Sequence, residues 1–284
     1  ISEALVGFSL PVLREMGVGN FPCLSDSLPI KGVPPHPAPI ASYGAMRETS
    51  TGKDTTTGHW EMAGLELKKG FHIFPPGPPS FPVELVNDFE TRTGRRIIGN
   101  KAASGTAIIE ELGRRHMTEG AWIVYTSADS VFQIAAHEGV IPLEELYHAC
   151  MVARELCDPY RVGRIIARPF IGGPGAFRRT ENRRDYSYRM PGNTIFHRLS
   201  SMNIPTITVG KLDDIFAGAP ISKSFHMENN RDAQKALNSL ADTHDDAFVF
   251  ANLIDFDMLY GHRRDPQGYA SALLDADCFL GQLL

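Results

Sequence analysis

A polar stretch at residues 50–61 has the side chains of a hydroxyl nucleophile and its helpers. Its sequence is STGKDTTTGHWE, so five of its twelve residues carry hydroxyls and two are glycines. A hydroxyl becomes a nucleophile when a base, a metal or a cation removes its proton or stabilises the alkoxide. Lys53, Asp54 and His59 lie within the stretch. Clusters of Ser, Thr, Asp and Gly are also ordinary turn and helix-cap sequences, so the residues alone leave both interpretations open.

The pair Gly52-Lys53 resembles the end of a nucleotide-binding P-loop. In that motif Ser or Thr follows the lysine, and another glycine precedes the second glycine by five positions. Here those positions hold Asp54 and Arg47. Phosphate binding of the P-loop kind is therefore excluded, whereas a hydroxyl nucleophile stays possible and the choice among five hydroxyls stays open.

A second polar stretch follows the most apolar predicted strand, residues 247–255. It holds Asp255, Asp257 and His262. Ligands of open parallel sheets bind beyond the carboxyl ends of the strands, and carboxylate and imidazole groups suit Mn²⁺, Zn²⁺ or Fe²⁺. The alternative is that the acids cap the next loop and His262 is a surface residue. Spacing does not choose between Asp255 and Asp257.

Three more charged residues lie next to predicted strands. Asp129 follows the strand at 122–126, Arg164 begins the strand at 162–170, and Lys211 follows the strand at 205–210. Arginine binds phosphate through two parallel hydrogen bonds and lysine binds it as a point charge, while an aspartate can bind sugar hydroxyls. Any one of them taken alone is more often a solvated surface residue.

Apolar strands alternate with helical patterns along the chain. This alternation predicts an α/β fold in which helices cover both faces of a mainly parallel sheet. Residues 20–48 are rich in proline and are expected to be irregular, and the Pro-Gly cluster at 74–79 indicates a crossover between domains. The expected helices are 1–17, 81–94, 104–112, 142–156, 194–202, 232–240 and 266–284. The expected strands are 96–99, 122–126, 162–170, 205–210 and 247–255, the last one buried.

Composition narrows the class of protein. The net charge of −5 offers no basic surface for nucleic acid. No apolar run approaches the roughly 18 residues of a membrane span, and the first residues do not have the pattern of a signal peptide. The four cysteines form no CxxC pair, as expected for reduced intracellular thiols. We therefore expect a cytoplasmic protein that binds neither nucleic acid nor membrane.

Five blocks of the sequence, in order, closely resemble the prokaryotic phosphopentomutase family of the alkaline phosphatase superfamily. The resemblance covers essentially the whole chain. It implies an alkaline-phosphatase-like core made of residues 1–69 and 190–284, with an α+β cap domain, residues 70–189, inserted in it. The blocks are residues 50–61, 97–106, 125–138, 162–170 and 255–269.

The resemblance also implies a reaction and its residues. Ribose 1-phosphate and ribose 5-phosphate, and the 2-deoxyribose pair, would interconvert through a phosphothreonine and a 1,5-bisphosphate, with a sugar bisphosphate as activator and two Mn²⁺ ions at the site. The phosphorylated and metal-contacting threonine falls on Thr55, and two metal ligands fall on Asp257 and His262. The implied substrate-binding residues are Asp129, Arg164 and Lys211.

The remaining metal ligands of the family have no counterpart here. They come from an aspartate after an N-terminal strand and from a later Asp-His-Gly motif and a further histidine, and the chain contains no Asp-His dipeptide. We therefore expect an internal fragment that lacks both ends of the core and has weak or no activity. Two alternatives stay open: a catalytically dead homologue that binds pentose phosphate, and a related metal-dependent phosphatase.

Overall fold

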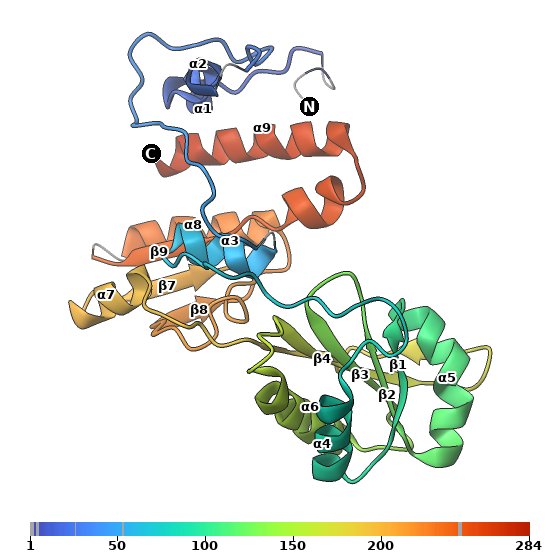
Figure 1. The fold of residues 1–284 in the computed structure, drawn as a ribbon. Helices are drawn as coiled ribbons and strands as arrows, with labels where there is room; N and C mark the ends of the chain where they lie inside the picture. Colours follow the sequence, from blue (N-terminus) through green and yellow to red (C-terminus); the bar gives the residue numbers. More distant parts are fainter. Residues whose placement is uncertain (1–2, 4–5, 26, 53, 244–245) are drawn as a thin grey trace. The chain divides into compact units, whose positions relative to one another are not determined.

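The computed structural model describes residues 3, 6–25, 27–52, 54–243 and 246–284 (Figure 1). They fall into two compact units, each with its own sheet and its own core. The first unit is Ile1–Thr49, Asn193–Asp213 and Ala219–Leu284, and the second is Ser50–Gly192 with Asp214–Gly218. The expected cap, residues 70–189, falls within the second unit, and its standing as an inserted domain stays a prediction.

The second unit contains a mixed six-stranded sheet. Strand β1 pairs with β2 and β3 pairs with β4 in parallel, whereas β2 and β3, β4 and β5, and β4 and β6 pair antiparallel. The order is β1-β2-β3-β4-β5, and β6 also pairs with β4. The strands are β1 (Ile97–Ala102), β2 (Trp122–Thr126), β3 (Val131–His137), β4 (Arg164–Ile171), β5 (Arg178–Arg179) and β6 (Arg184–Ser187).

Helices cover both faces of this sheet (Figure 1). Helices α4 (Val83–Thr93) and α6 (Leu143–Cys157) pack on one face, where Phe89 contacts the rings of Trp122 and Phe132. Helix α5 (Gly105–Glu119) packs on the other face, where Ile108 and Ile123 are fully buried. Successive strand residues point to opposite faces. Each large apolar side chain buried in this way contributes roughly 1.5–3 kcal/mol.

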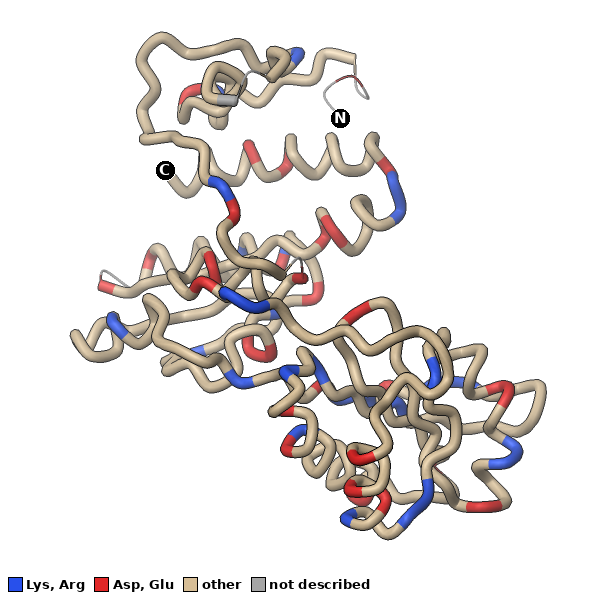
Figure 2. Tube along the Cα trace, viewed as in Figure 1, with Lys and Arg blue, Asp and Glu red and all other residues tan. Residues whose placement is uncertain are grey.

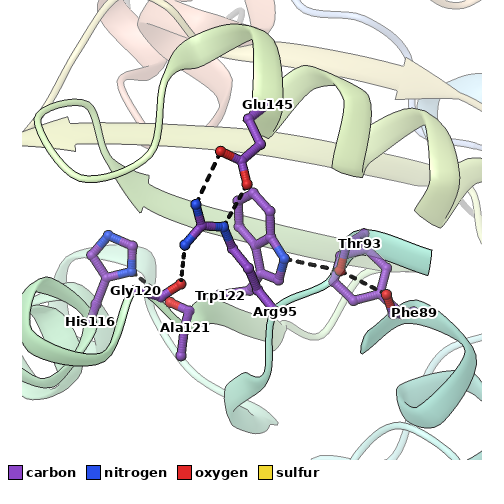
Figure 3. Close-up of polar contacts among 8 residues, drawn as sticks. All are labelled: Phe89, Thr93, Arg95, His116, Gly120, Ala121, Trp122 and Glu145. Carbon is purple, nitrogen blue, oxygen red and sulfur yellow. Dashed lines mark hydrogen bonds and ion pairs between the residues drawn. The ribbon is translucent and has the colours of Figure 1, made fainter. Parts of the chain in front are cut away.

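Arg95 connects three elements of the second unit (Figure 3). Its guanidinium donates to Glu145 of α6, with Nε 2.5 Å from Oε1, and to the Gly120 carbonyl oxygen at 3.0 Å, just after α5. It also lies over the ring of Trp122 in β2, 5.9 Å from the centroid. The indole Nε1 of Trp122 in turn donates to the Thr93 hydroxyl at 3.1 Å. These contacts fix the ends of α4 and α5 against α6 and the sheet.

The first unit contains a three-stranded parallel sheet in the order β8-β7-β9. The strands are β7 (Thr206–Val209), β8 (Lys223–Phe225) and β9 (Phe248–Ala251). Helix α8 (Asn230–Thr243) packs on it through Ala233 and Leu240, and α7 (Ile195–Ser201) packs Phe196 against the rings of Phe248 and Phe250. The expected α/β class, a mainly parallel sheet flanked by helices, is confirmed.

The amino-terminal part differs from the expected helix at 1–17. Within its described residues, helix is confined to α1 (Pro11–Glu15), followed by the 3₁₀ turn η1 (Val18–Asn20). Gly7 and Gly17 have φ of 74° and 100°, which interrupts a right-handed helix on either side of α1. A short helix, α2 (Pro22–Ser25), occurs where irregular chain was expected. Proline is tolerated there because it occupies the first helical turn.

The observed strands and helices differ from the expected ones in three other ways. The strand at 247–255 is shorter and half-buried, because β9 lies at the edge of the described sheet. Helix α5 runs on to Glu119, beyond the expected end at residue 112. Strands β3, β5, β6 and β8 had not been predicted. Helix α9 (Pro266–Leu283) is confirmed, and it packs on α1. No helix among the described residues is long and apolar enough to cross a membrane.

Candidate active site

The expected nucleophile lies at the start of helix α3 (Thr55–Met62) in the second unit. Asp54 is the N-cap, and its carboxylate accepts from the backbone N–H of Thr57 at 3.0 Å and from the Thr57 hydroxyl at 2.7 Å. Gly52 is required beside this pair, because a Cβ there would lie 2.4 Å from the Thr57 hydroxyl oxygen. Thr55 is the first helical residue and is exposed.

Several side chains of the stretch hold the loop in place. The Ser50 hydroxyl accepts from the Leu67 N–H at 3.0 Å, and the Thr51 hydroxyl donates to the Leu67 carbonyl oxygen at 3.3 Å. The ring nitrogen Nδ1 of His59 is 2.8 Å from the carbonyl oxygen of Thr55, one helical turn earlier. Lys53 lies outside the described residues. Ser50, Thr51 and Thr57 thus have structural hydrogen bonds, whereas Thr55 is exposed at a helix N-terminus.

In the first unit, Asp257 and His262 lie side by side. Asp257 lies in the first turn of the π-helical segment η2 (Phe256–Gly261), which follows β9, and His262 is its C-cap. His262 Nε2 is 3.3 Å from Asp257 Oδ2. Their side chains are 73% and 79% exposed. Asp255 has a different environment, because its carboxylate accepts from the Asn230 N–H at 2.9 Å and its own N–H donates to the Asn230 side chain. Asp255 therefore joins β9 to α8.

Lys211 lies beside the same turn of the first unit. It follows β7, and its Nζ is 3.2 Å from the sulfur of Met258 in η2. The chain bends sharply before it at Gly210, whose φ is 115°. A Cβ at Gly210 would lie 1.9 Å from the Asn252 side-chain oxygen, which accepts from the Lys211 N–H. The structure thus brings Lys211 close to the segment that carries Asp257.

Asp129 and Arg164 belong to the second unit and lie at the amino-terminal ends of two neighbouring strands of its sheet. Asp129 comes just before β3 and Arg164 begins β4, and these two strands are parallel, with Val131 opposite Arg164. The Arg164 N–H donates to the Ser130 carbonyl oxygen at 3.1 Å. Arg164 also lies 3.6 Å from the carboxylate of Asp185 in β6, a partner that no sequence pattern indicated, because the register of β6 on β4 decides it.

The donor chemistry of Asp257 and His262 fits part of a divalent-metal site. An imidazole nitrogen and a carboxylate oxygen 3.3 Å apart can bind one ion of the Mn²⁺ or Zn²⁺ type. The described ranges hold no cluster of three or more His, Cys, Asp or Glu side chains in metal-binding positions. The pair therefore offers two donors, and the geometry alone does not identify the ion.

Comparison with known proteins gives a similarity to one broad class of protein and to individual relatives. The model of the metalloenzyme superfamily matches residues 206–284, which contain β7, β8, β9, η2 and α9. The matched segment carries Lys211, Asp257 and His262, and its similarity is to the metalloenzyme superfamily.

The match to individual relatives extends over the whole chain. A phosphopentomutase of Anaeromyxobacter sp. (strain Fw109-5) is 51% identical over 284 residues, all of this chain and 71% of the relative. A phosphopentomutase of Caldanaerobacter subterraneus subsp. tengcongensis is 50% identical over 279 residues, 98% of this chain and 69% of the relative. The chain belongs to the phosphopentomutase family, and its enzyme class is that of an isomerase.

Proposed function

We propose that the protein interconverts the 1-phosphate and 5-phosphate of ribose and 2-deoxyribose through a phosphorylated Thr55. The observation that carries the proposal is the 51% identity to a phosphopentomutase along all 284 residues of the chain. The position of Thr55 supports the choice of nucleophile. It is exposed at the first residue of α3, and a helix N-terminus stabilises the negative charge of a phosphate group.

The proposed reaction transfers a phosphoryl group twice. The bond between phosphorus and Thr55 Oγ1 breaks, and a bond forms from phosphorus to the free hydroxyl of a pentose monophosphate. That hydroxyl loses its proton and the departing Thr55 oxygen gains one, so the transfer is balanced. The resulting 1,5-bisphosphate reorients and returns its other phosphate to Thr55. A sugar bisphosphate activator would supply the first phosphoryl group. Positioning and charge stabilisation are the main tasks of a protein in such a transfer.

The other predicted residues have complementary roles in this proposal. Asp129, Arg164 and Lys211 are proposed to contact the substrate. A guanidinium or an ammonium suits a phosphate group, and a carboxylate suits sugar hydroxyls. Asp257 and His262 would hold a divalent ion, proposed to be Mn²⁺, which neutralises charge on the phosphoryl oxygens. Because Asp54 is bonded to Thr57 and His59 to the α3 backbone, neither is proposed as the base. Residues 70–189 are proposed to exclude water as an inserted cap.

The test is turnover of ribose 1-phosphate to ribose 5-phosphate with Mn²⁺ and a sugar bisphosphate, in the full-length protein and in two threonine variants of it. We expect Thr55→Ala to abolish isomer formation and the phosphothreonine detected by mass spectrometry. Thr56→Ala is the matched control, because it removes the neighbouring hydroxyl, and it should keep most of the activity. Full activity of Thr55→Ala would overturn the assignment. Release of inorganic phosphate in excess of isomer would point to a phosphatase instead.

A further inference from the structure

The segment that forms β4, β5 and β6 is unusually rich in arginine. Residues 161–189 contain eight arginines, no lysine and two carboxylates, Glu181 and Asp185. Figure 2 shows basic residues close together around the part of the chain that Figure 1 labels β4. Arginine presents a planar fork of donors that matches carboxylate and phosphate groups, and it keeps its charge at any ordinary pH. Such a segment within one sheet is suited to binding an anion.

Three of these arginines line one cavity of the second unit. The cavity has a volume of about 230 Å³, and its lining residues are Arg168, Pro169, Arg179, Thr180 and Arg183. This is smaller than the roughly 300–1,000 Å³ of pockets that take drug-sized ligands. Its size suits a small anionic group, and its lining contains no carboxylate.

The protein balances the charges around this cavity only in part. Glu138, which is not in the lining, accepts from the lining residue Thr180 at 2.5 Å. Arg183 is paired with Asp185 through two hydrogen bonds of 2.6 and 2.7 Å. Arg179 donates to the neutral hydroxyl of Thr106 at 2.8 Å. The half-buried Arg168 donates to the neutral amide of Gln133 at 3.1 Å. The Asp185 carboxylate also lies 3.6 Å from Arg164. Arg168 and Arg179 therefore place two positive charges at the cavity without a carboxylate partner in the described residues.

The environment of Arg168 and its neighbours makes this arrangement unfavourable while no anion is bound. Burial lowers the pKa of Arg168, and the positive charges of Arg183 and Arg179 lower it further, although Asp185 acts in the opposite direction. The nearby hydroxyl of Tyr125 is fully buried and has no hydrogen-bond partner among the residues that the structure describes. It lies close to Arg179, since a Cβ built at Gly105 would be 2.6 Å from that hydroxyl and 3.6 Å from Arg179 Nη1.

We propose that the cavity lined by Arg168, Arg179 and Arg183 binds the phosphate group of a small phosphate or phosphate monoester. Two guanidiniums without carboxylate partners can each donate charge-assisted hydrogen bonds to its oxygens. A bound phosphate also removes the repulsion among the arginines. The site goes beyond the proposed function, because none of its three arginines is among the residues proposed to hold substrate. The phosphate has two sources, free inorganic phosphate or a sugar phosphate.

The test is calorimetric titration of the whole chain in EDTA, first with inorganic phosphate and then with ribose 5-phosphate. We expect Arg179→Gln to weaken phosphate binding by about tenfold, the loss typical of one or two charge-assisted hydrogen bonds. Arg178→Gln is the matched control. It removes the same charge from the same exposed strand, but neighbouring strand residues face opposite sides and Arg178 does not line the cavity. It should change the affinity less than twofold. Both positions are exposed, so neither variant is expected to unfold the protein.

A second pair of variants separates this site from the proposed substrate residues. If phosphate binds to the cavity, Lys211→Gln and Arg164→Gln keep the binding event that Arg179→Gln weakens, even where they weaken a separate binding event at the proposed substrate residues. The proposal is overturned if the wild type binds no phosphate, or if Arg179→Gln binds it as well as Arg178→Gln does. A sugar-phosphate ligand is indicated if the loss in Arg179→Gln is larger for ribose 5-phosphate than for inorganic phosphate. Equal losses indicate free phosphate.

Discussion

Acidification should destabilise the second unit through one buried histidine, His116. Its side chain is fully buried in α5, its Nδ1 is 2.6 Å from the Ala121 carbonyl oxygen, and its Nε2 accepts from the His137 N–H at 2.9 Å (Figure 3 shows the first of these contacts). Since Nε2 is an acceptor, the proton lies on Nδ1 and the ring is neutral. Protonation at Nε2 would break the bond to His137 and bury a charge.

The sign of the effect follows from the direction of the pKa shift. Burial lowers the pKa of His116 from its ordinary value of 6.5, and the charges of His137 and Arg95 lower it further, against the opposing bond to Ala121. Below the ordinary value the unfolded chain binds a proton that the folded chain does not. Stability is therefore lost as the pH falls through 6.5, and the loss continues down to the folded pKa.

The magnitude can be worked out for a ring that stays neutral in the folded protein. At about pH 5.5 the unfolded histidine is roughly ten to one protonated, so the free energy of unfolding falls by about 1.3 kcal/mol relative to pH 7. Urea unfolding followed by tryptophan fluorescence measures this fall. Trp60 and Trp122 are the two tryptophans of the chain, and both lie in the second unit.

Two variants make the measurement specific. His116→Gln should be less stable at neutral pH by about 1–3 kcal/mol, because a buried hydrogen bond is lost. Its free energy of unfolding should also fall less steeply as the pH is lowered, because its unfolding takes up about one proton fewer than that of the wild type. His148→Gln is the control, since His148 is an exposed residue of α6 in the same unit. It should keep the wild-type dependence on pH. The reasoning is refuted if His116→Gln and the wild type lose stability in parallel.

Three further predictions concern local structure. Arg95→Met should lower the free energy of unfolding by about 1–3 kcal/mol, because Glu145 loses its partner; no change in urea midpoint would contradict the role of this contact. Asp54→Ala should destabilise the start of α3 by about 1 kcal/mol, because the Thr57 N–H loses its cap, which faster amide exchange in α3 would reveal. Burial raises the pKa of the Cys157 thiol to about 12, so it should resist thiol reagents in the folded protein at mild alkaline pH, and rapid labelling would refute its burial. The thiols expected to react quickly are the exposed Cys23 and Cys278.

Local patterns in the sequence were enough for much of the fold. The apolar run at 122–126 predicted β2, and the helix expected from residue 266 is α9, because proline positions and hydrophobic periodicity act over a few residues. Asp54 before a run of threonines has the pattern of a helix cap, and the structure shows that cap at α3. The order of the five family blocks also identified the family that the relatives later showed.

The sequence alone determined the α/β class, the hydroxyl-rich stretch and the candidate residues. The tertiary structure decided which hydrogen-bond and ion-pair partners those residues have. Residues alone did not separate Asp255 from Asp257, and the structure shows that Asp255 pairs with Asn230, 25 residues away in the chain. Likewise, the register of β6 on β4 places the Asp185 carboxylate in contact with both Arg164 and Arg183. The apolar strand β9 is only half-buried, because it lies at the edge of the described sheet. Register and long-range pairing depend on contacts between distant segments, and no local pattern encodes them.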